Sequence, residues 1–234
     1  MQYGLTFLGL AAACGVVGWA AWDGVGWVAV LPLYAAFSFG VLAAAYLGAG
    51  PRLLFKRATG RRSPLGWLLL APYLVLSAAA FGLYRLLSRE PASVRVAPNL
   101  DFGRRLSARE FRAGGWAGVL DLAGEFGAAS PQRASAGYRS LPVLDAAAPS
   151  EAELRSAVAW LAGAVAAGPV YVHCALGHGR SACVVVAYLL SVGAVATVAE
   201  GVRKLRTLRP GVRLHPSQLR LLCRFEPAVS PSRG

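Results

Sequence analysis

The sequence predicts an α/β domain with a central, mostly parallel sheet, preceded by N-terminal transmembrane helices. Residues 1–22, 24–51 and 63–84 contain no charged side chain, whereas most charges follow residue 88. From that point the chain alternates short apolar runs with segments of helical periodicity, which is typical of a parallel sheet covered by helices. We therefore expect a membrane domain over residues 1–88 and a second domain over residues 89–234.

Composition agrees with a membrane-bound chain that has an anionic partner. Hydrophobic residues make up 56% of the 234 residues, above the roughly 45–50% of an ordinary soluble domain. The 24 basic residues outnumber the 11 acidic ones, giving a formal charge of +13. Such a charge suits an anionic membrane, a phosphorylated substrate or nucleic acid. Because the basic residues are divided between both parts of the chain, no nucleic-acid partner is expected.

Each charge-free window is long enough to cross a bilayer, which takes about 20 apolar residues. We expect two to three transmembrane helices at about residues 4–22, 26–49 and 64–86. A cleaved signal peptide is the alternative for the first window, because "LAAAC" ends it at a cysteine. A signal peptide carries a basic residue before its apolar run, and this sequence has none there.

The second domain begins with short apolar strands and continues with longer helices. Ser150 and Glu153 form a predicted capping box at the start of a helix over residues 151–168. Further helices are expected at 181–193 and 197–209. The expected strands are residues 93–97, 100–103, 118–123, 138–144 and 169–174.

The stretch "VYVHCALGHGRSACVVVAYLL", residues 170–190, places Cys174 between a buried strand and a helix. Ligands of α/β sheets bind at the carboxyl ends of strands. Gly177 and Gly179 can take positive φ, so that successive backbone N–H groups converge on an oxyanion. The start of the following helix and the forked donors of Arg180 favour the same charge. A thiolate is stabilised by these features too, so Cys174 is predicted to attack a bound phosphate.

These residues resemble a known family. His173, Cys174, Gly177, Arg180 and Ser181 match His-Cys-x-x-Gly-x-x-Arg-Ser, the loop of the cysteine-dependent protein tyrosine phosphatases. "LPVLDAAAPS" resembles the general-acid segment of the dual-specificity branch. "VAPNLDFGRRLSAREF" and "RPGVRLHPSQLRLL" are similar to its first strands and last helix, so the resemblance covers residues 93–226. Small membrane-anchored bacterial phosphatases are similar in plan, which implies a multi-pass protein of a bacterial inner membrane.

The resemblance implies a role for each matching residue. Cys174 would form a cysteinyl-phosphate, and Asp145 would protonate the leaving oxygen and later activate water. Ser181 would assist departure of the sulfur, and His173 would support the thiolate. No metal or other cofactor is implied. The phosphate oxygens would be held by the Arg180 side chain and by the amides of Ala175, Leu176, Gly177, His178, Gly179 and Arg180.

Several alternatives stay open at particular residues. The side chain of His178 could contact the substrate phosphate or simply occupy a permissive loop position. Glu151 and Glu153 are the alternatives to Asp145 as the acid, although both suit the start of a helix. Zinc is disfavoured because the His and Cys spacing lacks a paired-ligand pattern. The cysteines at positions 14, 183 and 223 are expected to be small buried hydrophobes.

We expect phosphomonoester hydrolysis at a membrane, with phosphoproteins as the first substrate class. A phospholipid head group, such as phosphatidylglycerophosphate or a phosphoinositide, is the close alternative. A phosphate-binding module without turnover is a third reading, which Asp145 disfavours. Anionic head groups could bind the basic residues of segment 201–225. These residues are Arg203, Lys204, Arg206, Arg209, Arg213, Arg220 and Arg224.

Two rules conflict over sidedness. The loop "PRLLFKRATGRR" has five basic residues and no acid, which favours the cytoplasm. Three full crossings would then place the second domain outside, whereas a reactive thiolate survives better in a reducing cytoplasm. We expect the third segment to lie in or re-enter the membrane, so that residues 58 and 95 share the cytoplasmic side.

Overall fold

The computed structural model describes residues 2–225, which fall into a helical unit and a sheet unit. The helical unit contains the chain up to Arg57, Arg61–Leu87 and Gly124–Phe126. The sheet unit contains Ala58–Gly60, Ser88–Ala123 and the residues from Gly127 onward. Each unit therefore includes a short segment whose sequence neighbours belong to the other.

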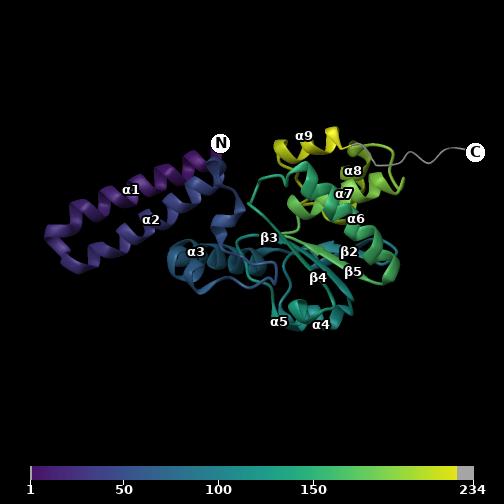
Figure 1. The fold of residues 1–234 in the computed structure, drawn as a ribbon, viewed down its shortest axis with the longest axis horizontal. Coiled ribbons are helices and arrows are strands. Elements are labelled where there is room, and N and C mark those ends of the chain that lie inside the picture. The colour runs from purple at the N-terminus through teal and green to yellow at the C-terminus, as the bar shows by residue number, and fades with distance from the viewer. Residues whose placement is uncertain (1, 226–234) are drawn as a thin grey trace, which may run out of the picture. The chain divides into compact units, whose positions relative to one another are not determined.

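The helical unit consists mainly of three long apolar helices. Helices α1 (Gln2–Val25) and α2 (Val30–Ala44) form an antiparallel hairpin (Figure 1). The short turns η1 (Gly26–Ala29), η2 (Ala45–Ala49) and η3 (Pro51–Leu54) precede and follow α2, and α3 spans Pro64–Leu87. Three stretches are long and apolar enough to cross a membrane, at Gln2–Gly24, Gly26–Ala49 and Pro64–Leu87.

The sheet unit contains a five-stranded sheet in the order β1-β2-β5-β3-β4. Its strands are β1 (Ser93–Ala97), β2 (Leu100–Gly103), β3 (Gly118–Ala123), β4 (Gly137–Val143) and β5 (Val170–His173). Only the β1–β2 pair is antiparallel among these strands, while β2, β5, β3 and β4 run parallel. The predicted fold class, with its mostly parallel sheet, is confirmed.

Helices cover both faces of this sheet (Figure 1). Apolar side chains of the strands pack with those of α6–α9 into the main core, and a smaller cluster around Phe111 and Tyr171 lies under α4. The buried face of β5 is thus filled by α7, whose residues Arg180 to Leu189 are all buried. The helices are α4 (Ala108–Gly114), α5 (Ser130–Ala134), α6 (Glu151–Ala167), α7 (Arg180–Ser191), α8 (Val198–Leu208) and α9 (Pro216–Arg224).

Local sequence signals explain several helix starts. The predicted capping box of Ser150 and Glu153 is present at α6, and Ser107 with Glu110 forms a second one at α4. Helices α4 and α5 were not expected from the sequence because they are only 7 and 5 residues long. Such lengths give no clear helical periodicity.

The cysteine expectation was wrong at one position. Cys183 is buried in α7, but Cys223 is exposed on α9 and Cys14 is only half-buried. Cys223 follows the buried Leu222, and consecutive residues of a helix point in different directions. Its side chain therefore lies outside the core.

The sheet register brings three strand ends together. Gly103 of β2 and Asp121 of β3 are both paired with His173, the last residue of β5. Because these strands are parallel, their carboxyl ends lie at one edge of the sheet. The loop that begins at Cys174 therefore starts at this edge.

Candidate active site

The loop from Cys174 to Gly179 joins β5 to α7 and encloses the sulfur of Cys174. The Gly177 N–H donates to Cys174 Sγ at 3.3 Å, and Gly177 has φ +79°. A Cβ on Gly177 would lie 2.4 Å from the carbonyl carbon of Gly103, so a side chain does not fit there. Gly179, expected to take positive φ, instead has φ −116°.

The carbonyl groups of this loop are held by donors outside it. Cys174 O lies 3.0 Å from His173 Nδ1, and Ala175 O accepts from the Arg105 N–H at 2.8 Å. A trans peptide places each carbonyl opposite the next N–H. Carbonyls that point outward therefore turn the following N–H groups inward. The outer pairs are completed by Leu176 O with Arg209 Nη2 at 2.8 Å and His178 O with the Arg213 N–H at 3.0 Å.

The inward-facing amides, the first turn of α7 and one guanidinium form a site for a tetrahedral oxyanion. Arg180, the first residue of α7, is 2% exposed and donates to Val143 O at 2.9 Å. Ser181 Oγ lies 3.5 Å from Cys174 Sγ. Backbone N–H groups, a helix N-terminus and an arginine fork all favour negative charge. The loop can therefore hold phosphate against the sulfur.

Asp145 lies in the segment between β4 and α6, beside this loop. Its carboxylate is 2.9 Å from Arg180 Nη2, and the side chain is 67% exposed. The buried Gln218 of α9 fixes the same segment by donating to Ala147 O at 2.8 Å. A carboxylate thus stands at the rim of the oxyanion site, where a substrate can reach it.

The two alternative acids have structural partners at the start of α6. Glu153 accepts from the Ser150 N–H at 2.7 Å as part of the capping box. Glu151 forms an exposed ion pair with Arg155 at 2.9 Å. Both contacts agree with the interpretation that these glutamates stabilise the start of α6.

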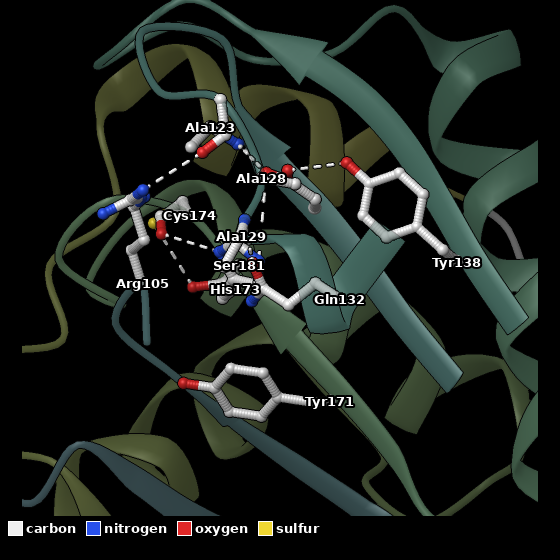
Figure 2. Close-up of polar contacts among 12 residues, drawn as sticks. Arg105, Ala123, Ala128, Ala129, Gln132, Tyr138, Tyr171, His173, Cys174 and Ser181 are labelled. Atoms are coloured by element: carbon white, nitrogen blue, oxygen red, sulfur yellow. Dashed lines mark hydrogen bonds and ion pairs between the residues drawn. The ribbon is translucent and has the colours of Figure 1, made fainter. Parts of the chain in front are cut away.

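His173 lies below the sulfur in a buried polar network (Figure 2). Its Nε2 is 3.2 Å from the Gln132 side-chain nitrogen and 3.9 Å from Asp121 Oδ1. The Tyr138 hydroxyl donates to Asp121 Oδ2 at 2.9 Å. Burial, followed by the charge of Asp121, raises the pKa of Tyr138 above its usual value, so the hydroxyl stays protonated as a donor.

The His178 side chain contacts a residue outside the loop. Its Nε2 lies 2.6 Å from Glu90 Oε2, so the ring is held by a residue that precedes β1. Within residues 2–225, no group of three or more His, Cys, Asp or Glu is placed to hold a metal ion. The His178 ring is thus part of a hydrogen-bonded contact with Glu90 and not of a metal site among the described residues.

Sequence reasoning missed the residues that support the loop from outside. Asp121 had a detectable signal, because a charge inside the otherwise apolar run "GVLDLA" needs a buried partner. Gln132 and Gln218 gave no such signal, since their neighbours in sequence are unremarkable helix residues. Arg105, Arg209 and Glu90 act through contacts between segments that are far apart in the chain.

Comparison with known proteins agrees with this geometry. Residues 127–228 match the family "Dual specificity phosphatase, catalytic domain". The curated relative "Phosphatidylglycerophosphate phosphatase PTPMT2" of Arabidopsis thaliana is 44% identical over 61 residues. That alignment covers 26% of this chain and 26% of the relative, so the chain spans about a quarter of the relative's length.

Solved structures extend the similarity to more than half of the chain. Tk-PTP in the active form aligns with TM-score 0.52 and 26% identity, covering 59% of this chain and 99% of that chain. PTPMT1 in complex with PI(5)P aligns with TM-score 0.51 and 25% identity, covering 58% and 94%.

The sheet unit is therefore a cysteine-dependent phosphatase domain of the dual-specificity type. The enzyme class predicted from the loop of residues 173–181 is confirmed. The same chain contains three helices that are long and apolar enough to cross a membrane.

Proposed function

We propose that this chain hydrolyses the phosphomonoester of a phospholipid head group, such as phosphatidylglycerophosphate or a phosphoinositide, at a membrane surface. The observation that carries the phosphatase chemistry is the loop with inward amides around Cys174 Sγ. The lipid substrate is supported by the curated relative, which is named as a phosphatidylglycerophosphate phosphatase, and by the apolar helices. Phosphoproteins, ranked first from the sequence, have less support than the lipid alternative.

In the proposed first step, the Cys174 thiolate attacks phosphorus in line with the leaving oxygen. The S–P bond forms as the P–O bond to the alcohol breaks, and Asp145 gives its proton to that oxygen. The Arg180 guanidinium contacts the Asp145 carboxylate at the rim of the oxyanion site and Val143 O inside the protein. Arg180 is therefore positioned to assist both the formation and the hydrolysis of the cysteinyl-phosphate. The loop amides stabilise the charge on the equatorial oxygens.

In the proposed second step, Asp145 accepts a proton from water, and this water attacks phosphorus. The S–P bond breaks and inorganic phosphate leaves. The Ser181 hydroxyl, 3.5 Å from the sulfur, can hydrogen-bond the departing thiolate. His173, held by Gln132 on one side, keeps the Cys174 carbonyl turned away from the phosphate.

The surface next to the loop can take a second anionic group of the substrate. A hollow of about 600 Å³ is lined by His178, Arg206, Gly211 and Arg213 among others. Both arginines are exposed. The expectation for Arg209 was wrong, because its side chain is 0% exposed and it cannot meet a lipid head group. Its interior position is explained by an ion pair with Glu90 at 3.1 Å.

We also propose that α3 lies along the membrane surface. The segment Ala58–Gly60, which precedes α3 in the chain, belongs to the sheet unit. There the Gly60 carbonyl accepts a hydrogen bond from the Ala128 N–H at 2.9 Å. Gly60 has φ +75°, and a Cβ there would lie 2.2 Å from the Tyr138 hydroxyl. The chain before α3 and the chain after it would then share one side. Because α3 is one continuous helix, it cannot re-enter the membrane as a hairpin.

Cys174→Ser is expected to abolish phosphate release while the oxyanion site survives. Serine is a far weaker nucleophile at neutral pH than a thiolate, whereas the amides and Arg180 are unchanged. Phosphate release by the full chain in detergent should fall below a few percent of wild type, and tungstate should still protect the variant against thermal unfolding. Turnover above that level would remove Cys174 from the role of nucleophile.

Asp145→Asn is expected to slow hydrolysis of alkyl phosphates by roughly 10² or more, the scale of general acid catalysis. The loss should be smaller with p-nitrophenyl phosphate, whose leaving group needs less protonation. Glu151→Gln is the matched control, because Glu151 is also exposed but pairs with Arg155. Equal rates for Asp145→Asn and wild type on an alkyl phosphate would assign the acid elsewhere.

The substrate proposal predicts a preference between two phosphate esters. The full chain reconstituted in anionic vesicles should release phosphate from phosphatidylglycerophosphate or phosphatidylinositol phosphate at least tenfold faster than from a phosphotyrosine peptide, compared by kcat/KM. Cys174→Ser provides the blank. A chain that hydrolyses the peptide and leaves both lipids untouched would be a protein phosphatase.

The surface placement of α3 predicts which residues share a side of the membrane. In a chain with Cys14, Cys174 and Cys223 replaced by serine, cysteines at the exposed positions Thr59 and Ala113 should react with an impermeant maleimide from one side. A cysteine at the exposed Gly24, near the carboxyl end of α1, should react from the opposite side. Labelling of Thr59→Cys and Ala113→Cys from opposite sides would mean that α3 crosses the membrane.

A further inference from the structure

A carboxylate outside the active-site loop contacts several groups that support it. Glu90 lies in the short segment between α3 and β1, and its side chain is 20% exposed. It contacts His178 Nε2 at 2.6 Å, the Gly211 N–H at 2.6 Å and Arg209 Nη2 at 3.1 Å. We call Glu90, His178, Arg209 and Gly211 the Glu90 clamp.

Arg209 connects this carboxylate to the loop backbone. Its guanidinium donates to Leu176 O at 2.8 Å and also to Pro91 O. The side chain is fully buried, and a buried charge is stable only when it is paired. Glu90 provides the opposite charge at 3.1 Å. The position of the Leu176 carbonyl therefore depends on Glu90 through Arg209.

The peptide group between Leu176 and Gly177 is the one that the clamp orients. Its carbonyl faces Arg209 at 2.8 Å, and its N–H faces Cys174 Sγ at 3.3 Å. The two groups of a trans peptide point in opposite directions, so fixing the carbonyl fixes the N–H. On the far side of Gly177, the His178 ring is bonded directly to Glu90. One carboxylate thus holds both residues that flank Gly177.

Two further observations, on the space around Gly211 and on the charge of Glu90, support the Glu90 clamp. A Cβ on Gly211 would lie 2.5 Å from both Glu90 Oε1 and His178 Nε2, so any side chain there would displace the contacts. Although partial burial raises the pKa of Glu90, the hydrogen bonds from His178 and Gly211 and the charge of Arg209 lower it below its ordinary value overall. Glu90 is therefore a carboxylate at neutral pH.

We propose that Glu90 is a positioning residue for catalysis, which through Arg209 and His178 keeps the Gly177 N–H directed at the sulfur and at the phosphate oxygens. The His178 side chain then acts on the loop through its hydrogen bond with Glu90. The inference depends on the cysteine-phosphate chemistry and not on the identity of the substrate. It also assigns a catalytic effect to the segment that links α3 to the phosphatase domain, outside residues 127–228 that match the family.

The test compares Glu90→Gln and Gly211→Ala with wild type in the full chain, purified in detergent and assayed with p-nitrophenyl phosphate. Three quantities are measured: kcat and KM, the inhibition constant of tungstate, and the pH dependence of Cys174 alkylation by iodoacetamide, followed by mass spectrometry. We expect kcat/KM to fall and the tungstate constant to rise by about tenfold each, the scale of one charge-assisted hydrogen bond. The pH of half-maximal alkylation should rise by about one unit.

Glu110→Gln is the matched control. Glu110 is a carboxylate of the same unit that pairs with Arg104 at 2.7 Å, and the hydrogen bond from Arg104, despite partial burial, lowers its pKa to about 2. It makes no contact with His178 or Arg209 among those described. Glu110→Gln should lower the melting temperature, while tungstate inhibition and alkylation stay at wild-type values.

Some outcomes would overturn the proposal. One is a folded Glu90→Gln or Gly211→Ala chain that melts at a lower temperature but keeps wild-type tungstate inhibition and alkylation, because Glu90 would then be structural only. If neither variant folds, His178→Gln preserves the Arg209–Glu90 pair and should raise the tungstate constant severalfold; an unchanged constant overturns the proposal. Failure to hydrolyse lipids would leave these measurements intact, since they use p-nitrophenyl phosphate.

Discussion

The active site depends on the direction of a few peptide groups in the loop between β5 and α7. An oxyanion binds where several N–H groups converge, and peptide planarity allows this only if the matching carbonyls are satisfied on the outside. Each outer carbonyl named above has its own donor, and these donors come from separate parts of the chain. Arg105 follows β2, Arg209 and Arg213 follow α8, and His173 ends β5. The phosphatase loop is therefore shaped mainly by its surroundings.

The sheet supplies the rigid frame for these donors. Because β2, β3 and β5 are parallel and in register at His173, the segments that leave them begin next to one another. Arg105 can thus reach Ala175, and Asp121 can lie beneath His173 without long connecting loops. Gly103 and Gly177 permit the close approach of two backbones that a Cβ would prevent. Polar partners below and apolar residues of α7 behind the loop leave it little freedom to invert a peptide.

The sequence predicted the parts of the site that are contiguous in the chain. Cys174, Gly177, Arg180 and Ser181 fall within eight residues, and their chemistry could be read from residue type and spacing. Asp145 was proposed as the acid only through resemblance to a family segment. The contacts of Glu90 with His178, Gln132 with His173 and Gln218 with Ala147 could not be predicted, because only the tertiary fold brings these pairs together. The fold class was predictable because charge-free windows and strand–helix alternation are properties of long segments.

The mixed outcome for the basic residues shows the same limit. Composition marks Arg203, Arg206, Arg209 and Arg213 as one positive segment, but helix geometry and burial separate them. Arg209 points inward to Glu90, whereas the other three are exposed.

Glu90 in turn lies three residues after Leu87, a distance of at most about 11 Å along an extended chain. A residue that supports the phosphate loop is thus attached by a very short segment to the end of an apolar helix. Chain connectivity alone therefore keeps Glu90, our proposed positioning residue, close to the end of α3, the helix that we propose to lie at the membrane surface. This proximity favours a substrate whose phosphate also lies at that surface.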